Sequence, residues 1–262
     1  MNELIKVEGL SKSFKLSKKQ QTIEKTQDSV RHAVQSLSFS AYEGEIFGIL
    51  GPNGAGKTTT LRLLATLIKP DEGDAFINGL SIVKDPSGVR SKIGFLTSEL
   101  KLEEFFTPNY LFDFFSSLHG VDPETSEKRK SELFSRFGID KFSEVKVANL
   151  STGMKQKASL AISLVHDPDI IIFDEPTNGL DVLTARVVTD FLQDLKERGK
   201  TIIVSTHIFS LIEKLCDRVG IIIDGRMVEC DTLANVCKGK SLEDRFFDIF
   251  VEHEQSKGGE EI

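Results

Sequence analysis

The chain has 262 residues, of which 39% are hydrophobic and 28% charged, an ordinary balance for a folded protein with a buried core. Its length predicts one large domain with room for a subdomain. The formal net charge of −7 disfavours nucleic acid as a partner, because proteins that bind it usually present a basic face.

No apolar run approaches the roughly 20 residues that a membrane-spanning helix needs. The first residues lack the basic segment and apolar core of a signal peptide. We therefore expect a cytoplasmic protein that reaches a membrane only through a partner. The three cysteines, Cys216, Cys230 and Cys237, form no CxxC pair, so we expect reduced thiols.

Strand patterns and one polar interruption make up the first third of the chain. A strand is predicted over residues 5–14, and strand character resumes at residue 34. Residues 15–31 between them are polar and charged, which predicts an insertion or surface loop. A compact apolar strand at 46–50 precedes a helix from 57 to about 67. Short strands are expected around residues 75–77, 81–83 and 93–96.

Helices and strands alternate in the rest of the chain. Residues 107–137 are predicted to be mostly helical, with Thr107 as N-cap and Pro108 at the first helical position. Helices at 152–166, 182–198 and 208–216 alternate with strands at 170–173, 201–205 and 219–223. This alternation predicts a parallel, layered α/β sheet. An amphipathic helix begins at Leu242, and residues 255–262 are predicted to be a disordered tail.

A phosphate-binding loop is predicted between the strand at 46–50 and the helix from 57. The segment matches GxxxxGK[ST], and glycines let backbone N–H groups turn inward around phosphate oxygens. Lys57 can reach the β- and γ-phosphates, and the Thr58 hydroxyl can bind Mg²⁺. The expected nucleotide-binding residues are Gly51, Pro52, Asn53, Gly54, Ala55, Gly56, Lys57, Thr58 and Thr59.

Two carboxylates end the apolar strand at 170–173. Ligands of open α/β sheets bind at the carboxyl ends of the strands. Asp174 is therefore placed to hold the Mg²⁺ shell, and Glu175 to orient or deprotonate a water aimed at the γ-phosphate. An Asp-Glu pair at a strand end is commonly just a solvated strand end. The phosphate loop in the same chain is what favours a metal-binding and catalytic role for this pair.

The segment 150–156, Leu-Ser-Thr-Gly-Met-Lys-Gln, resembles the LSGGQ signature of ABC ATPases, with Thr152 for the first family glycine and Met154 for the glutamine. A plain helix start capped by Ser151 is the alternative interpretation. Other family motifs follow in the family's order. Phe14 matches the aromatic that stacks on adenine, residues 178–181 resemble the D-loop that ends at Asp181, and His207 matches the switch histidine.

This resemblance runs from about residue 5 to 231 and implies a P-loop NTPase fold. The expected RecA-like core carries an N-terminal antiparallel β subdomain and an inserted α-helical subdomain at about 100–165. The ATP-binding domain is expected over residues 1–240, followed by a C-terminal amphipathic helix and flexible tail over 241–262. The family further implies ATP hydrolysis with Glu175, His207 and Lys57 as catalytic residues, and Mg²⁺ held through water by Thr58 and Asp174.

Partners also follow from the resemblance. The family dimerises on ATP, so Ser151 and Gly153 of one subunit are expected to contact the γ-phosphate held by a second ATP-binding subunit, identical or homologous. A separate integral membrane permease is the expected partner, which would place the chain on the inner face of the cell membrane.

One position departs from the family pattern. Ser98 stands where the family has the glutamine that links the ATP site to the helical subdomain, and serine is too short to reach metal and water. With the stretch 101–108, this departure resembles the sodium-exporting branch of bacterial ABC ATPases. An exporter of sodium or another small cargo is therefore expected, with the cargo selected by the permease.

Two further points concern partners. A soluble ABC ATPase that acts on ribosomes or nucleic acid is the alternative function. It is disfavoured because the chain has one such domain rather than two, and no long coiled coil.

Eight of the 19 phenylalanines lie between Phe105 and Phe142. Phe112, Phe114 and Phe115 cannot share one helix face, and Phe105 and Phe106 are predicted to line a groove for a permease helix.

Overall fold

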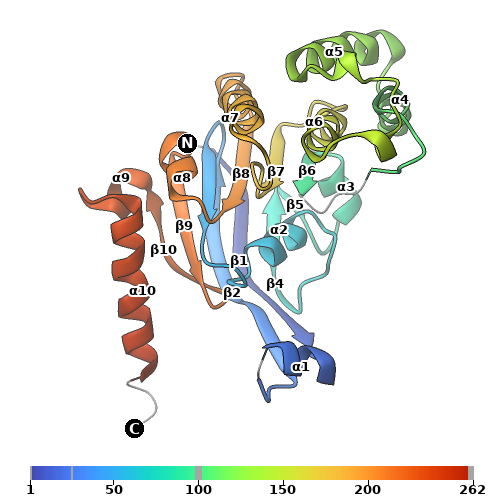
Figure 1. The fold of residues 1–262 in the computed structure, drawn as a ribbon. Helices are drawn as coiled ribbons and strands as arrows, with labels where there is room; N and C mark the ends of the chain where they lie inside the picture. Colours follow the sequence, from blue (N-terminus) through green and yellow to red (C-terminus); the bar gives the residue numbers. More distant parts are fainter. Residues whose placement is uncertain (1, 25, 98–101, 259–262) are drawn as a thin grey trace.

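A computed structural model describes residues 2–24, 26–97 and 102–258. Its larger sheet has the strand order β10-β9-β3-β8-β7-β6, and all neighbouring strands in it are parallel except the antiparallel pair β10 and β9 (Figure 1). The predicted parallel α/β sheet is thereby confirmed. Its strands are β3 (Ile46–Leu50), β6 (Ile93–Thr97), β7 (Ile170–Asp174), β8 (Thr201–Thr206), β9 (Arg218–Ile223) and β10 (Arg226–Thr232).

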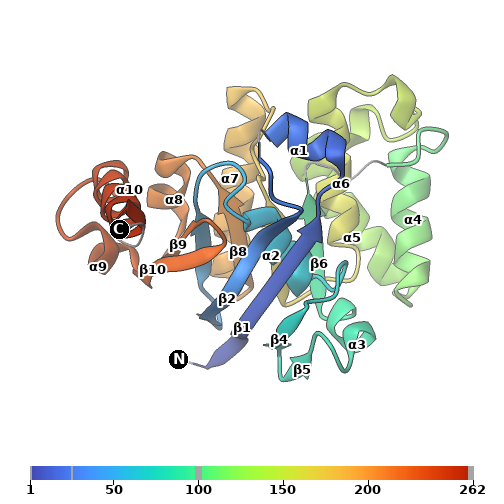
Figure 2. The same ribbon diagram turned by 90° about the horizontal axis from the view of Figure 1, so that it is seen from below.

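The second sheet is antiparallel and comes from the N-terminal part of the chain, which confirms the expected fold class. Figure 2 shows β1, β2 and β4 side by side, in agreement with their pairing. Its strands, in the order β2-β1-β4-β5, are β1 (Glu3–Lys15), β2 (Val30–Tyr42), β4 (Glu72–Ile77) and β5 (Leu80–Ser81).

Helices flank these sheets on opposite sides of the molecule. Helices α4, α5 and α6 pack against one another at one side, and α10 lies at the other (Figures 1 and 2). Thr107 caps α4 as predicted, its hydroxyl accepting from the Tyr110 N–H. The helices are α1 (Lys18–Glu24), α2 (Lys57–Leu64), α3 (Pro86–Arg90), α4 (Pro108–Leu118), α5 (Pro123–Phe137), α6 (Thr152–Ser163), α7 (Val182–Glu197), α8 (Phe209–Leu215), α9 (Leu233–Cys237) and α10 (Leu242–Gly258).

Both faces of the larger sheet are buried. Ile171 and Phe173 of β7 pack into the core under α6 and α7, whereas Ile170 and Ile172 pack into the core shared with the antiparallel sheet. A strand covered on both faces needs an unbroken apolar run rather than an alternating one. The apolar runs of β3, β7 and β9 therefore follow from their central positions.

Three local expectations differ in part from the structure. Residues 15–31 contain the helix α1, which begins with a capping box in which Ser17 and Gln20 exchange side-chain and backbone hydrogen bonds. Helix α2 ends at Leu64 because Thr66 is left-handed and closes a Schellman turn. Helix α10 continues to Gly258, so residues 255–258 are helical; residues 259–262 lie outside the described residues.

Two other expectations can be compared with the structure. The three cysteines, predicted to be reduced, are unpaired. Within residues 2–24, 26–97 and 102–258, no helix has both the length and the apolar composition to cross a membrane. Ser98, where the sequence departs from the family, lies outside the described residues.

Candidate active site

The predicted phosphate loop connects β3 to α2, and its glycines sit where a side chain could not. Gly54 and Gly56 have φ of 85° and 105°, a left-handed conformation that favours glycine. A Cβ at Gly51 would lie 2.3 Å from the carbonyl oxygen of Ile222, and one at Gly56 2.2 Å from that of Ala33. The loop is therefore held tightly against the backbones of β9 and β2.

Lys57 is the first residue of α2, and its side chain is buried. Its ammonium donates to the carbonyl oxygens of Gly51 (2.8 Å) and Pro52 (3.2 Å) and lies 3.8 Å from a Glu175 carboxylate oxygen. Burial lowers the pKa of Lys57, while Glu175 and Asp174 act in the opposite direction. The ammonium thus bonds to the loop's own carbonyl groups inside the curve of the loop.

Asp174 ends β7 with a buried carboxylate that accepts two hydroxyl hydrogen bonds. Ser205 of β8 donates to its Oδ1, and Thr58 of α2 donates to the same oxygen at 3.2 Å. Hydroxyl and carboxylate oxygens are the ligands that Mg²⁺ prefers. The donor set of Thr58 and Asp174 therefore fits this ion.

Glu175 follows directly and has a left-handed backbone, φ 52°, an uncommon conformation for a residue with a side chain. Its N–H bonds to the Ser205 carbonyl at 3.0 Å. Its carboxylate accepts from the Thr206 hydroxyl at 3.2 Å and lies 2.9 Å from Nδ1 of the half-exposed His207. The left-handed turn at Glu175, the Thr206 hydroxyl and the His207 imidazole together fix the direction of the Glu175 carboxylate.

The structure brings most of the predicted catalytic residues together. Lys57, Thr58, Asp174, Glu175 and His207 form one connected set of contacts at the carboxyl ends of β3, β7 and β8. Ser205 and Thr206 belong to this set, although the sequence interpretation missed them. Their position at the end of an apolar strand, just before His207, was the available signal.

The predicted adenine-stacking residue Phe14 lies near the end of β1 and is 39% exposed. It pairs across the sheet with Arg31, whose guanidinium donates to the Gly54 carbonyl at 3.4 Å. Phe14 is therefore the cross-strand neighbour of a residue that contacts the phosphate loop. Arg31 falls in the segment predicted as a polar insertion, so its contact with the loop was not foreseen.

The signature residues lie elsewhere. Ser151 caps α6, its hydroxyl accepting from the Met154 N–H at 3.3 Å. A Cβ at Gly153 would lie 4.0 Å from an Asp181 carboxylate oxygen and 3.9 Å from the Thr184 hydroxyl. Asp181 caps α7, and its hydrogen bonds, chiefly from the Thr184 hydroxyl, lower its pKa. Among the described residues, no hydrogen bond joins Ser151 or Gly153 to the phosphate loop of the same chain.

Comparisons with known proteins agree with this geometry. The family described as "ABC transporter" matches residues 34–178. The ABC transporter ATP-binding protein NatA of Bacillus subtilis is 38% identical over 213 residues, covering 81% of this chain and 87% of NatA. An uncharacterized ABC transporter ATP-binding protein of Methanocaldococcus jannaschii, MJ1023, is 39% identical over 238 residues, covering 91% and 81%.

Solved structures show the same fold. An ATP-binding subunit of an ABC transporter aligns with a TM-score of 0.82 and 26% identity, covering 94% of this chain and 99% of that one. A dimeric post-hydrolysis state of the cassette MJ0796, bound to ADP and Pi, aligns with a TM-score of 0.76 and 26% identity, covering 87% and 98%. The chain therefore belongs to the ABC transporter family, as an ATP-binding subunit that hydrolyses ATP.

Proposed function

We propose that this chain is the motor subunit of an exporter and that it dimerises on ATP to drive a separate membrane permease. The observation that carries the proposal is the connected set of Lys57, Thr58, Asp174, Glu175 and His207 at the strand ends. One chain supplies the groups for phosphate binding, metal binding and activation of water, in one place.

Each residue has a defined role in this proposal. Lys57 exchanges the loop carbonyls for the β- and γ-phosphates, and Thr58 and Asp174 hold the Mg²⁺ that neutralises phosphate charge. Glu175 orients the attacking water and takes its proton, since its carboxylate is already directed by Thr206 and His207. Phe14 stacks on the adenine, and the N–H groups of residues 51–59 bind the phosphates.

The proposed dimer uses the surface around the signature. Val182 and Leu183, directly after Asp181, are 85% and 80% exposed, an unusual environment for two adjacent large apolar side chains. They lie near Gly153 of α6, since a Cβ built at Gly153 would be 3.9 Å from the Thr184 hydroxyl in the first turn of α7. A second subunit, identical or homologous, would cover this surface and receive the signature at its own phosphate loop.

The proposed permease site is a cavity of about 630 Å³ between the larger sheet and the helices α4 and α6. Its apolar wall includes an aromatic row in which Phe106 stacks on Tyr110 (centroids 4.5 Å apart) and Tyr110 on Phe114 (6.3 Å). Phe105, although 80% exposed, is not among the lining residues. The structure therefore supports Phe106, and not Phe105, as a groove residue for an apolar permease helix.

Relatives support export and differ in cargo. One is named a Nod factor export ATP-binding protein (Burkholderia orbicola, 37% identical, covering 74% of this chain and 64% of that one), and another a linearmycin resistance ATP-binding protein (Bacillus subtilis, 34% identical, 78% and 66%). We therefore assign the choice between sodium and another small cargo to the permease. The chain would work on the cytoplasmic face of the membrane. No observation favours the ribosome or nucleic acid as its partner.

The test is Glu175→Gln, which keeps the shape of the side chain but removes its capacity to take a proton. We expect ATP turnover to fall at least about 100-fold, because general-base catalysis contributes about 10²–10⁴. ATP binding should persist, and a dimer should accumulate in gel filtration with Mg²⁺ and ATP. The matched control is Glu132→Gln, an exposed carboxylate paired with Arg198. Near wild-type turnover of the Glu175 variant would refute the assignment.

A further inference from the structure

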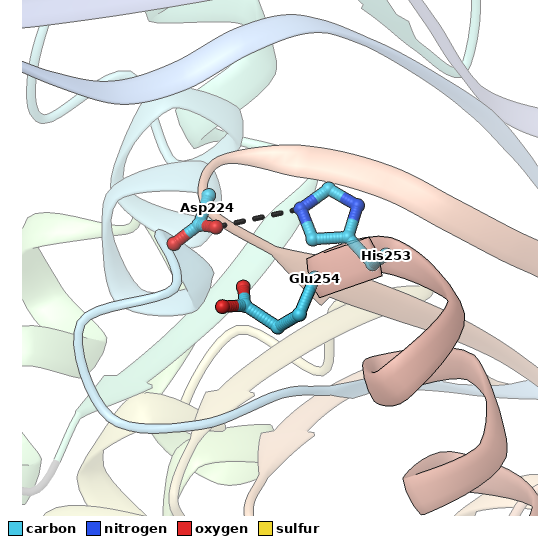
Figure 3. Close-up of side chains that lie close together, drawn as sticks. All are labelled: Asp224, His253 and Glu254. Atoms are coloured by element: carbon cyan, nitrogen blue, oxygen red, sulfur yellow. Dashed lines mark ion pairs between the residues drawn. The ribbon is translucent and has the colours of Figure 1, made fainter. Parts of the chain in front are cut away.

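Three side chains of metal-binding type meet near the end of α10, and they are distinct from the carboxylates Asp174 and Glu175 of the candidate active site. Asp224 lies in the turn between β9 and β10, and His253 and Glu254 lie in α10. One donor atom from each lies within 4.8 Å of the other two. In Figure 3 the Asp224 carboxylate faces the imidazole ring of His253, and the Glu254 carboxylate extends from the helix toward them.

The His253 nitrogen supplies the more specific observation. Its Nε2 is buried, and it forms no hydrogen bond with any residue that the structure describes. The nearest carboxylate oxygen, Oδ2 of Asp224, lies 3.4 Å away, longer than an ordinary N–H···O hydrogen bond of about 2.7–3.2 Å. Two ligands on a tetrahedral zinc ion at about 2.1 Å are themselves about 3.4 Å apart. The His–Asp spacing therefore suits two ligands of one ion better than a direct hydrogen bond.

Glu254 completes the set. Its carboxylate is exposed, and one of its oxygens lies within 4.8 Å of the donor atoms of Asp224 and His253. One imidazole nitrogen and two carboxylate oxygens suit zinc, whereas Mg²⁺ prefers an octahedral shell of oxygen atoms.

We propose that Asp224, His253 and Glu254 bind a divalent transition-type cation, of which zinc is the best match, with water in the fourth position. The site is separate from the Mg²⁺ site of the proposed function and does not depend on it. It joins the far end of α10, whose Leu242, Phe246 and Ile249 are already buried, to the β9–β10 turn.

That turn is rigid and adjoins the phosphate loop. Asp224 and Gly225 are both left-handed, with φ of 48° and 78°. The Asp224 carbonyl accepts from the Gln35 amide at 2.8 Å, and the Gly225 N–H donates to the Ala55 carbonyl at 2.9 Å. A bound cation would thus connect α10, through Asp224 and Gly225 of the turn, to the phosphate loop.

The experiment uses the full chain, expressed without a histidine tag and freed of metal with a chelator. Titration calorimetry with ZnCl₂, without nucleotide or Mg²⁺, should show one site. At 100 times the dissociation constant, zinc should raise Tm by about 5–10 °C. His253→Ala and the isosteric, exposed Asp224→Asn should each weaken binding at least about 10-fold. Asp248→Asn, an exposed carboxylate of the same helix, should leave it unchanged.

Cobalt provides the spectroscopic check, because a site of nitrogen and oxygen ligands gives no thiolate-to-metal absorption. Failure of the wild-type chain to bind zinc at 1 mM would overturn the proposal. Equal zinc binding by wild type, His253→Ala and Asp224→Asn would overturn it too, as would a thiolate band that is lost in Cys237→Ser.

Discussion

The proposed permease groove makes a quantitative prediction for Phe106. A phenylalanine side chain can bury about 200 Å², and 39% of Phe106 is exposed. A docked helix would therefore cover about 80 Å² more, which corresponds to about 2 kcal/mol at about 25 cal/mol per Å². Phe106→Ala should weaken permease binding about 30-fold. Phe105→Ala should change it less than about 2-fold, because Phe105 lies outside the cavity wall.

Phe106→Ala also removes the stacked contact with Tyr110, so loss of binding must be separated from loss of folding. The tagged wild-type chain first captures its permease from detergent-solubilised membranes, and the captured permease is then titrated with each variant. Melting temperature is measured in parallel. Phe114→Glu places a charge in the same wall at a half-exposed position and should abolish docking with little effect on Tm. Normal permease binding by both groove variants would refute the reasoning.

Three other variants test the site and its surroundings. Lys57→Ala should weaken ATP binding about 10-fold or more, because it removes a charge-assisted phosphate contact worth about 1.5–3 kcal/mol; calorimetry with Mg²⁺ and ATP measures this, and an unchanged affinity would contradict the role. Ser98→Gln should change the Mg²⁺ dependence of turnover, and identical kinetics would make Ser98 a bystander. Burial lowers the pKa of His166 to about 4, so the unfolded chain, with a histidine pKa of about 6.5, binds more protons between these values. Stability should therefore fall by about 2 kcal/mol from pH 7 to pH 5. The variant His166→Gln can still donate to the Ile93 carbonyl but does not titrate in this range. Its free energy of unfolding, measured with urea, should therefore lose that part of the pH dependence. The same pH profile as wild type would contradict this role of His166.

Central strands and the phosphate loop were predictable because their physical requirements are local. Ile46–Leu50 and Ile170–Asp174 are buried on both faces, so an unbroken apolar run marks them without knowledge of their neighbours. The phosphate loop needs glycine at left-handed positions and a following helix, and both requirements are written in consecutive residues. The predicted positions of these strands therefore agreed closely with the structure.

Edge elements were missed because their residues alternate or are polar. Strand β10 is only half-buried, and β9 is its single neighbour in the sheet. Its signal was the Asp224-Gly225 pair, a common two-residue hairpin turn. Helix α1 is exposed and was predicted only as part of an insertion or surface loop, although Ser17-x-x-Gln20 has the spacing of a capping box. In both cases the information lay in turn and capping residues rather than in hydrophobicity.

Contacts across the site were less accessible to sequence. Register shifts between β1 and β2 at Leu10, Lys12 and Ser13 decide that Phe14 faces Arg31, and no local pattern encodes them. The contact between Asp224 and His253 joins residues 29 apart through the packing of α10. Ser205 and Thr206 support the two carboxylates only because β8 is the neighbour of β7 in the sheet.

The charged groups of the site are bonded to neighbouring groups of the same chain. Lys57 bonds to its own loop, Asp174 to two hydroxyls, and Glu175 to Thr206 and His207. Within the part of the chain that the structure describes, the signature residues Ser151 and Gly153 form no hydrogen bond with their own phosphate loop. In the proposed dimer, hydrolysis consequently waits for the second subunit, because one chain holds the water-activating carboxylate but not the groups that close over the γ-phosphate.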